Sequence, residues 1–397
     1  MIKKVLITKE VLLPDRIKLE RFRKAPELGP RILFFSGGNA LKGLSKKIID
    51  YTHNSIHLIT PFDSGGSSAK IREAYKMIAV GDLRNRLMAL ADQSVKGNPD
   101  IYRLFAFRLP KEENRGALLQ TLFEMREGAH PMIKVIKQPM RTLICNHLGF
   151  FIERMTPGFD LQGASIGNLI LTGGYLNNNR HIDTVLFLFS RLVEVRGYVK
   201  PTLEKLYNLN AVLEDNTMLI GQHLITGKEH EPIKTPVKEI FISELNRPEK
   251  PVTASIANDV ENLIRNAELV CYPMGSFYTS VLSNLLPVGV AKAVAANKCP
   301  KVYIPNTFPD PEQKGIDMQR SVEQILSFLR KGEKKYNTRK LLDFILVDTK
   351  NVDYPSKIDT KKIKKMGIDI IDTELVTKDS FPYIHADKLL QILLSLT

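Results

Sequence analysis

The chain has 397 residues, of which 43% are hydrophobic and 25% are charged, as expected for a folded protein with a substantial core. No apolar run is long enough to cross a membrane, and charges interrupt the N-terminus every few residues, so we expect no membrane partner and a cytoplasmic location. The formal net charge of +14 favours an anionic partner such as a nucleotide or a phosphorylated metabolite.

Cysteines and basic stretches indicate no special chemistry. Cys145, Cys271 and Cys299 are far apart, which is typical of core thiols rather than of a zinc site or a disulfide framework. The basic stretches 330–340 and 357–367 contain few aromatic residues and match no RNA- or DNA-binding module. A solvated lysine-rich surface explains them better than nucleic-acid binding, which stays as a minor alternative.

From Arg31 onward, short apolar runs alternate with polar loops and amphipathic helices. Strands are predicted at 31–35, 55–60, 267–273, 301–306 and 341–349, and a Gly-rich element at 163–167 opens another helix. This alternation predicts a mostly parallel sheet covered by helices on both faces. Ligands bind such sheets beyond the carboxyl ends of the strands, where the polar loops should converge.

Two segments depart from this pattern. Residues 94–160 are mostly helical in character and could form a lid or a second lobe of the substrate site. Residues 193–243 show period-two alternation with a turn at Asp215-Asn216, which predicts a small antiparallel β excursion. We therefore expect residues 1–29 to be an N-terminal extension and residues 30–397 to be one domain containing both segments.

The loop 61–68, PFDSGGSS, combines an acid with glycines at the end of a predicted strand. Gly65 and Gly66 allow backbone N–H groups to approach a phosphate, and the following helix N-terminus favours negative charge. Asp63 would repel that phosphate unless a cation intervened, so it is a candidate Mg²⁺ ligand, with helix capping as the alternative. Ser67 and Ser68 are either helix caps or phosphate donors.

Two further loops repeat this logic. The segment 81–86, GDLRNR, should open a helix with Asp82 as its N-cap, and Arg84 near that N-terminus is expected to neutralise a phosphate or pair with Asp63. The loop 274–280 offers the hydroxyls of Ser276, Tyr278 and Thr279, with Tyr278 either stacking on a base or packing against the sheet. The first loop, SGGNAL, lacks the spacing of a dinucleotide fingerprint or a P-loop.

The motifs, taken in order, resemble the CofD-like family. They are SGGNALKGL, FDSGGSSAKIR, GDLRNRLMALAD, LFAFRL, GASIGNLIL, VKPT, AVLEDNTMLIGQHLI, YPMGSFYTSVLSNLL and VYIPN. That family contains the 2-phospho-L-lactate transferases of deazaflavin coenzyme biosynthesis and the YvcK-type proteins that bind UDP-sugars. The resemblance implies an α/β, Rossmann-like three-layer sandwich that binds a nucleotide at its glycine loops, with Mg²⁺ required in the transferases.

The resemblance also identifies the expected site. It implies that Asp63 holds the metal and that the remaining ligand-binding positions are Gly37, Gly38, Asn39, Gly65, Gly66, Ser67, Ser68, Asn85, Ser165, Gly167, Asn168, Gly275, Ser276, Tyr278, Thr279 and Asn306. Three motifs depart from the family pattern. Ser64 replaces the second acid of an aspartate pair, Ala164 replaces a histidine, and the first loop reads Ser36–Ala40 where three glycines, threonine and glycine are usual.

Two main hypotheses follow. In the first, a Mg²⁺-dependent transferase moves a phosphoryl-linked group of the phospholactate type from a nucleoside diphosphate donor to a hydroxyl acceptor such as a deazaflavin precursor. Asp63 and Arg84 would be its catalytic residues. In the second, the chain is a non-catalytic regulatory protein that binds a nucleotide sugar. A second copy of the chain is left open as a partner.

Overall fold

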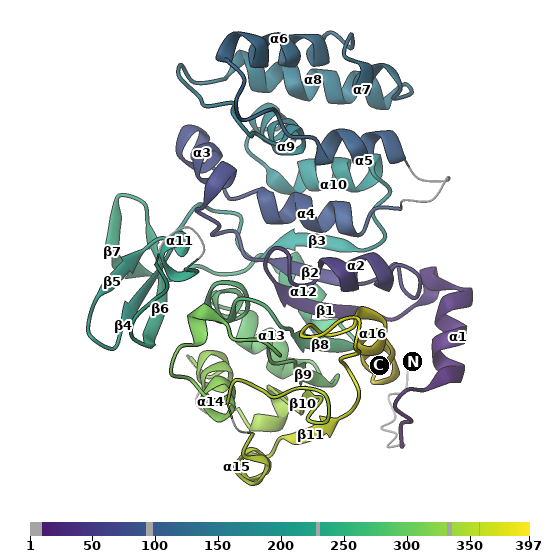
Figure 1. Cartoon of the computed structure of the whole chain (residues 1–397), viewed down its shortest axis with the longest axis vertical. Helices are drawn as coiled ribbons and strands as arrows, with labels where there is room; N and C mark the ends of the chain where they lie inside the picture. The colour runs from purple at the N-terminus through teal and green to yellow at the C-terminus, as the bar shows by residue number, and fades with distance from the viewer. Residues whose placement is uncertain (1–9, 93–97, 228–230, 332–335, 357) are drawn as a thin grey trace.

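A parallel sheet forms the centre of the protein. The computed structural model describes residues 10–92, 98–227, 231–331, 336–356 and 358–397, so parts of the predicted extension, of the helical segment and of both basic stretches lie outside the described residues. Seven strands pair in parallel in the order β11-β10-β9-β8-β1-β2-β3 (Figure 1). They are β1 Ile32–Ser36, β2 Ile56–Ile59, β3 Tyr198–Pro201, β8 Leu269–Tyr272, β9 Lys301–Tyr303, β10 Phe344–Val347 and β11 Asp369–Asp372.

Strand β1 lies inside this sheet, between β8 and β2, and every one of its residues is buried. Because side chains alternate along a strand, Ile32 and Phe34 pack into one core while Leu33 and Phe35 pack into a second core on the other face. A strand buried on both faces is continuously apolar, which is why the run 31–35 predicted it. The predicted α/β three-layer fold is confirmed.

Helices cover both faces of the sheet, and among the described residues none is long and apolar enough to cross a membrane. The core of Ile32 and Phe34 receives side chains from α1 Arg16–Lys24, α2 Lys42–Ile48, α3 Gly66–Tyr75, α4 Gly81–Ala89, α5 Pro99–Ala106, α6 Arg115–Arg126, α7 Pro131–Lys134, α8 Met140–Glu153, α9 Ile166–Asn177, α10 Ile182–Leu192 and α16 Ala386–Ser395. The core of Leu33 and Phe35 receives side chains from α11 Gln222–Ile225, α12 Asn258–Arg265, α13 Val290–Ala296, α14 Met318–Leu329 and α15 Thr360–Lys365.

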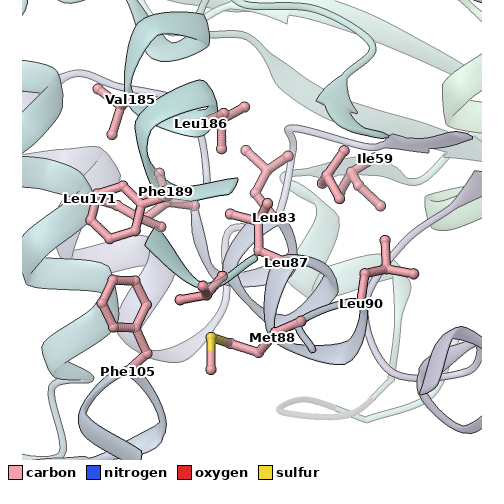
Figure 2. Packing of buried hydrophobic residues seen from close by; sticks show 14 of the residues in the cluster. Ile59, Leu83, Leu87, Met88, Leu90, Phe105, Leu171, Val185, Leu186 and Phe189 are labelled. Atoms are coloured by element: carbon pink, nitrogen blue, oxygen red, sulfur yellow. The ribbon is translucent and has the colours of Figure 1, made fainter. Parts of the chain in front are cut away.

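Helices α5 to α8 lie within the predicted helical segment 94–160 and stack above the sheet with α9 and α10 (Figure 1). Figure 2 shows how this lobe joins the sheet: Leu83 and Leu87 of α4 meet residues of α9 and α10, including Leu171 and Phe189. The ring of Phe189 also lies 4.7 Å from that of Phe105 on α5, centroid to centroid. The lobe and the sheet therefore share one continuous core.

The antiparallel excursion differs from its predicted bounds. Its order is β5-β4-β6-β7, with β4 Asn208–Leu213, β5 Met218–Ile220, β6 Val237–Glu244 and β7 Arg247–Val252. The predicted start at 193 is too early, because β3 pairs in parallel with β2 at the edge of the main sheet. The predicted end at 243 is too early as well, since β7 completes a hairpin with β6. A polar edge strand such as β7 carries no apolar alternation to mark it.

The N-terminal extension packs against the C-terminal helix. The Asp15 backbone N–H donates to Ser395 Oγ at 2.8 Å, and the Lys18 ammonium donates to the carbonyls of Ser395 and Thr397. Helix α16 in turn packs beside α2, the helix that follows the first glycine loop. The two ends of the chain therefore support the same part of the sheet, as Figure 1 shows at its right-hand side.

We expect Phe189→Ala to lower the free energy of unfolding by about 3–5 kcal/mol, because it leaves a cavity where α4, α5, α9 and α10 meet. Phe187→Ala, on the same helix but with its side chain 61% exposed, is the matched control and should cost less than about 1 kcal/mol. Denaturant unfolding of both variants measures the difference. Equal losses would contradict a core shared by the lobe and the sheet.

Candidate functional site

A cavity of about 710 Å³ lies beyond the carboxyl ends of β1, β2, β8 and β9. The structure brings eight of the predicted site residues to its wall, from four loops that are far apart in sequence. They are Gly37, Gly38, Asn39, Asp63, Gly65, Gly275, Ser276 and Asn306. Parallel pairing explains this convergence, because it aligns the carboxyl ends of neighbouring strands along one edge.

The first loop exposes its backbone to the cavity. A Cβ at Gly37 would collide with Ser280 Oγ, and a Cβ at Gly38 would lie 2.5 Å from Asp82 Oδ1, so a side chain at either position would require these neighbours to move. The Arg86 guanidinium donates to the carbonyls of Gly37 at 3.1 Å and Gly38 at 3.2 Å and to the Ser45 hydroxyl. These bonds hold the loop from beneath.

Arg86 also determines the electrostatics of this loop. Its side chain is buried, and burial lowers the pKa of Arg86 to about 10, partly offset by Asp82. A group with that pKa remains protonated at neutral pH. The positive charge behind the glycine loop therefore favours an anion in the cavity, where the surrounding low dielectric strengthens the attraction.

Asp63 lies in a polar corner at the end of β2. Its Oδ1 accepts the Gly65 N–H at 3.2 Å, and α3 has Gly65 as its N-cap with no side-chain bond, so Asp63 does not cap that helix. A Cβ at Gly81 would lie 2.7 Å from Ser68 Oγ, 3.7 Å from Asp63 Oδ2 and 3.9 Å from Asn168 Nδ2. Three oxygen-bearing side chains thus converge around Gly81, while Gly66 and Ser67 open α3 without lining the cavity.

Buried polar atoms without a protein partner gather around this cavity. Both amide atoms of Asn168, the Ser36 hydroxyl and Gln222 Oε1 have no hydrogen-bond partner among the described residues. Ser36 and Gln222 line the cavity, whereas the almost completely buried Asn168 does not line it and, like Asp63, lies within 4 Å of the Cβ position of Gly81. A buried polar group without a hydrogen-bond partner lowers the free energy of unfolding by about 1–3 kcal/mol. These atoms therefore indicate places where a ligand or a water molecule supplies the missing hydrogen bonds.

The loop after β8 is held in place by Asn306. Asn306 Oδ1 accepts the Gly275 N–H and Asn306 Nδ2 donates to the Gly275 carbonyl, both at 2.8 Å. Gly275 has a φ of +134°, a conformation that other residues rarely adopt. This clamp presents Ser276 to the cavity, as its motif predicts.

The next residues of that loop face the protein instead. The N–H groups of Tyr278 and Thr279 donate to Glu312 Oε2 at 2.8 and 2.9 Å, and the Thr279 hydroxyl donates to Glu312 Oε1 at 2.5 Å. The Tyr278 hydroxyl donates to the Val237 carbonyl at 3.3 Å, which corresponds to the packing alternative for this residue. The backbone N–H groups of Tyr278 and Thr279, two residues that were expected to contact phosphate, thus bind the carboxyl group of Glu312.

Four predicted residues form a separate buried cluster that does not line the cavity. Arg84 donates to the Ser165 hydroxyl and, at 2.5 Å, to Asn85 Oδ1. A Cβ at Gly167 would lie 2.7 Å from the Phe105 carbonyl, so Gly167 permits α5 and α9 to approach. Burial and nearby Arg108 lower the pKa of Arg84 to about 10. Arg84 therefore fastens the helical lobe in this structure rather than reaching the cavity.

Ser64 stands where the family's second acid is expected. It is hydrogen-bonded to His223 of α11, the short helix between β5 and β6 of the antiparallel sheet. Its hydroxyl lies 2.8 Å from His223 Nδ1 and accepts the His223 N–H at 3.1 Å. Both hydrogen bonds of the Ser64 hydroxyl are therefore made with His223 of α11. The bond ties the loop after β2 to the antiparallel sheet.

Sequence reasoning missed several residues that shape the site. Asp82 is not an N-cap, because α4 begins at Gly81 with Val80 before it, and its carboxylate instead lines the cavity beside Gly38. Arg86 lies only two positions beyond the predicted Arg84. Nothing in the motif GDLRNR indicates which of the two arginines contacts the first loop. The other missed residues are Gln222, His223, Asp310 and Glu312, which come from segments without a phosphate-loop pattern.

The three cysteines have no role at this cavity. Cys271 is buried in β8, where burial raises the pKa of its thiol, and Cys145 and Cys299 are half-buried. None of the three lines the cavity, and within the described ranges no group of three or more His, Cys, Asp or Glu side chains is placed to hold a metal.

The chain belongs to the CofD family, described as 2-phospho-L-lactate transferase CofD, whose sequence profile matches residues 32–376. It is 27% identical over 382 residues to the gluconeogenesis factor of Listeria monocytogenes, covering 93% of this chain and 96% of that protein. It is 26% identical over 365 residues to the gluconeogenesis factor of Bacillus subtilis, covering 88% and 92%. The resemblance read from the motifs is confirmed.

A solved structure has the same fold. The crystal structure of a UPF0052 family member from Bacillus halodurans matches with a TM-score of 0.67 at 23% sequence identity, covering 92% of this chain and 99% of that chain. At that identity the likeness establishes the α/β architecture alone.

Glu312 should make folding stability depend on pH. Burial, with a smaller contribution from Asp310, raises the pKa of Glu312 from its ordinary 4.5 to about 8. Because the folded state then holds the proton more tightly than the unfolded chain, stability should fall as pH rises from about 4.5 to about 8. Glu312→Gln keeps an oxygen for the two N–H groups and does not titrate, so its stability should fall less over that range.

Chemical denaturation at pH 5, 6.5 and 8 checks this expectation. Glu323→Gln, a carboxylate on the exposed face of α14, is the matched control and should follow the wild-type pH dependence. If Glu312→Gln showed the same slope as the wild type, Glu312 would not be the group that titrates.

Proposed function

We propose that the cavity binds a nucleoside-diphosphate-linked small molecule, and that the chain acts as a nucleotide-sugar-binding regulatory protein. The observation that carries this proposal is the set of unpartnered polar atoms, Ser36 Oγ, the Asn168 amide and Gln222 Oε1, around backbone loops that lie above the buried Arg86. A diphosphate would meet the loop N–H groups and the positive charge of Arg86. Sugar or base hydroxyls and amides would satisfy the unpaired side chains.

The residues near Gly81 fit a bound Mg²⁺. The Asp63 carboxylate and the Ser68 hydroxyl are oxygen donors of the kind that Mg²⁺ prefers. The Asn168 amide has its nitrogen toward Gly81, and its oxygen, which lacks a partner among the described residues, would face the ion once the amide is rotated. When bound there, the ion would neutralise part of the diphosphate charge. It would also remove the repulsion between Asp63 and the phosphates. Asp63 is therefore the proposed metal ligand.

Ser64 and the relatives favour binding over turnover. The Ser64 hydroxyl is bonded to His223, so the corner keeps one acid from the family's pair. The relatives that match over nearly the whole chain are named gluconeogenesis factors rather than transferases. A regulatory protein binds its ligand and releases it unchanged. The residues that line the cavity supply the contacts for such binding.

The second candidate is transfer of a phosphoryl-linked group to a hydroxyl acceptor. It is favoured by two carboxylates in the cavity wall, Asp63 and Asp82, and by the transferase for which the family is described. In that reaction the acceptor oxygen would bond to the phosphorus that bears the transferred group while the bond from that phosphorus to the nucleoside monophosphate breaks and the monophosphate leaves. One acid would hold Mg²⁺, and the other would take the proton of the acceptor hydroxyl. Incubation with a nucleoside diphosphate donor and a deazaflavin acceptor, followed by mass spectrometry, separates the candidates: a new phosphodiester product would establish the transferase.

Asn168→Leu is the sharpest test of the proposed binding. Because neither amide atom has a partner in the described structure, a leucine of similar volume should leave the melting temperature of the free protein unchanged or raise it. The same variant should lose the stabilisation that UDP-N-acetylglucosamine with Mg²⁺ confers on the wild type, which at a hundredfold excess over Kd is about 2.7 kcal/mol.

Asn177→Leu is the matched control, since Asn177 is exposed on the same helix. It should retain the full ligand-induced shift. Asp63→Asn should keep the fold but abolish the difference between measurements with and without Mg²⁺. Stabilisation of Asn168→Leu by the nucleotide sugar equal to that of the wild type would refute this placement of the ligand.

A further inference from the structure

Two exposed aromatic side chains stand side by side in the wall of the cavity. Phe308 follows β9 and Tyr383 precedes α16, and both line the cavity with 52% and 65% of their surface exposed. Their ring centroids are 6.3 Å apart and their planes are inclined by 46°. Large aromatic surfaces left in water next to a polar cavity are typical of a site where a flat partner binds.

The segments that carry these rings are joined to each other. The Thr307 hydroxyl donates to the Pro382 carbonyl at 2.6 Å, one residue away from each ring. The backbone around Tyr383 is fixed by its own N–H bond to the Ser380 carbonyl and by the His385 N–H bond to the Leu375 carbonyl, each at 2.7 Å. The two rings are therefore presented together and not on independent loops.

One of the two rings, that of Tyr383, comes from outside the region that matches the family, whereas Phe308 lies within it. The family match ends at residue 376, whereas Tyr383 and the neighbouring Ile384 also line the cavity. Helix α16 follows directly and is fastened to the N-terminal extension through Ser395, as described above. The C-terminal segment thus adds Tyr383 and Ile384 to the wall of a cavity whose other lining residues lie within the family match.

We propose that Phe308 and Tyr383 stack on the nucleobase of a ligand whose diphosphate lies at the glycine loops of the same cavity. This inference rests on the proposed function and names the part of the ligand that the aromatic wall recognises. Every nucleobase has a flat face, so stacking favours a base without selecting uracil over guanine. The two ring faces carry no charge and stacking through them does not bind phosphate, so we expect the base and the diphosphate to contact different residues.

The test compares probes with and without a base, in the full chain with Mg²⁺. Calorimetry measures the affinities for uridine diphosphate, guanosine diphosphate and inorganic pyrophosphate. Phe308→Ala and Tyr383→Ala should each weaken both nucleotides by about tenfold, the effect expected from the loss of one stacking partner, and change the pyrophosphate affinity less than twofold. Tyr383→Phe should retain the wild-type affinities, because it keeps the ring.

Phe381→Ala is the matched control. Phe381 lies in the same segment with 66% of its surface exposed, yet it does not line the cavity, so its loss should change no affinity. Unchanged nucleotide affinity in Phe308→Ala and Tyr383→Ala would overturn the inference. An equal loss for pyrophosphate would also overturn it, because the rings would then act on the loops.

Two results separate this inference from the proposed function. If the wild type bound neither the nucleotides nor pyrophosphate, the proposed function would fail, and the stacking role with it. If the wild type bound nucleotides with unchanged affinity in the variants, while a free deazaflavin bound the wild type and lost affinity in the variants, the rings would serve a flat acceptor. That result would overturn the nucleobase assignment alone.

Discussion

The contact between Arg86 and the first glycine loop is the constraint on which the rest of the site depends. A buried guanidinium must find acceptors for its N–H groups, and here it finds them in the carbonyls of Gly37 and Gly38. These bonds engage the two terminal guanidinium nitrogens of Arg86 and leave its Nε without a partner among the described residues, and the loop that they hold lines the cavity. One interaction therefore shapes the loop and supplies positive charge behind it, while Ser280 and Asp82 lie where side chains at the two glycines would be placed.

The opposite wall is organised by carboxylates and amides that bind the backbone. Asn306 clamps Gly275, while Glu312 takes the N–H groups of Tyr278 and Thr279 that a phosphate loop would otherwise offer. The first loop of the cavity, at Gly37 and Gly38, is thus held by the guanidinium of Arg86. In the loop after β8, the N–H groups of Tyr278 and Thr279 already donate to Glu312. A diphosphate would accordingly lie nearer to the first loop than to the residues after Ser276.

Much of the fold was predictable from the apolar runs, because buried parallel strands such as β1 must be apolar on both faces. The strand β3 was missed, since a short edge strand containing lysine and proline carries no such signal. For the site, the structure brings residues of the glycine-rich loops such as Asp63 and Gly37 to one cavity, and their contact with a ligand stays a prediction. Arg84 was expected at the ligand, but Arg86, two residues later, is the one that reaches the loop.

The sequence by itself determined the α/β class, the family and the loops that meet at the carboxyl edge of the sheet, because local patterns and motif order encode all three. Only the tertiary structure decided which groups remain available to a ligand. The amide atoms of Asn168 have no hydrogen-bond partner among the described residues, whereas the N–H groups of Tyr278 and Thr279 donate to Glu312. Tyr383 lines the cavity although it lies near the C-terminal end of the sequence. The physical reason is that a hydrogen bond forms only between atoms about 3 Å apart in space. The number of residues between two groups in the sequence does not determine that distance.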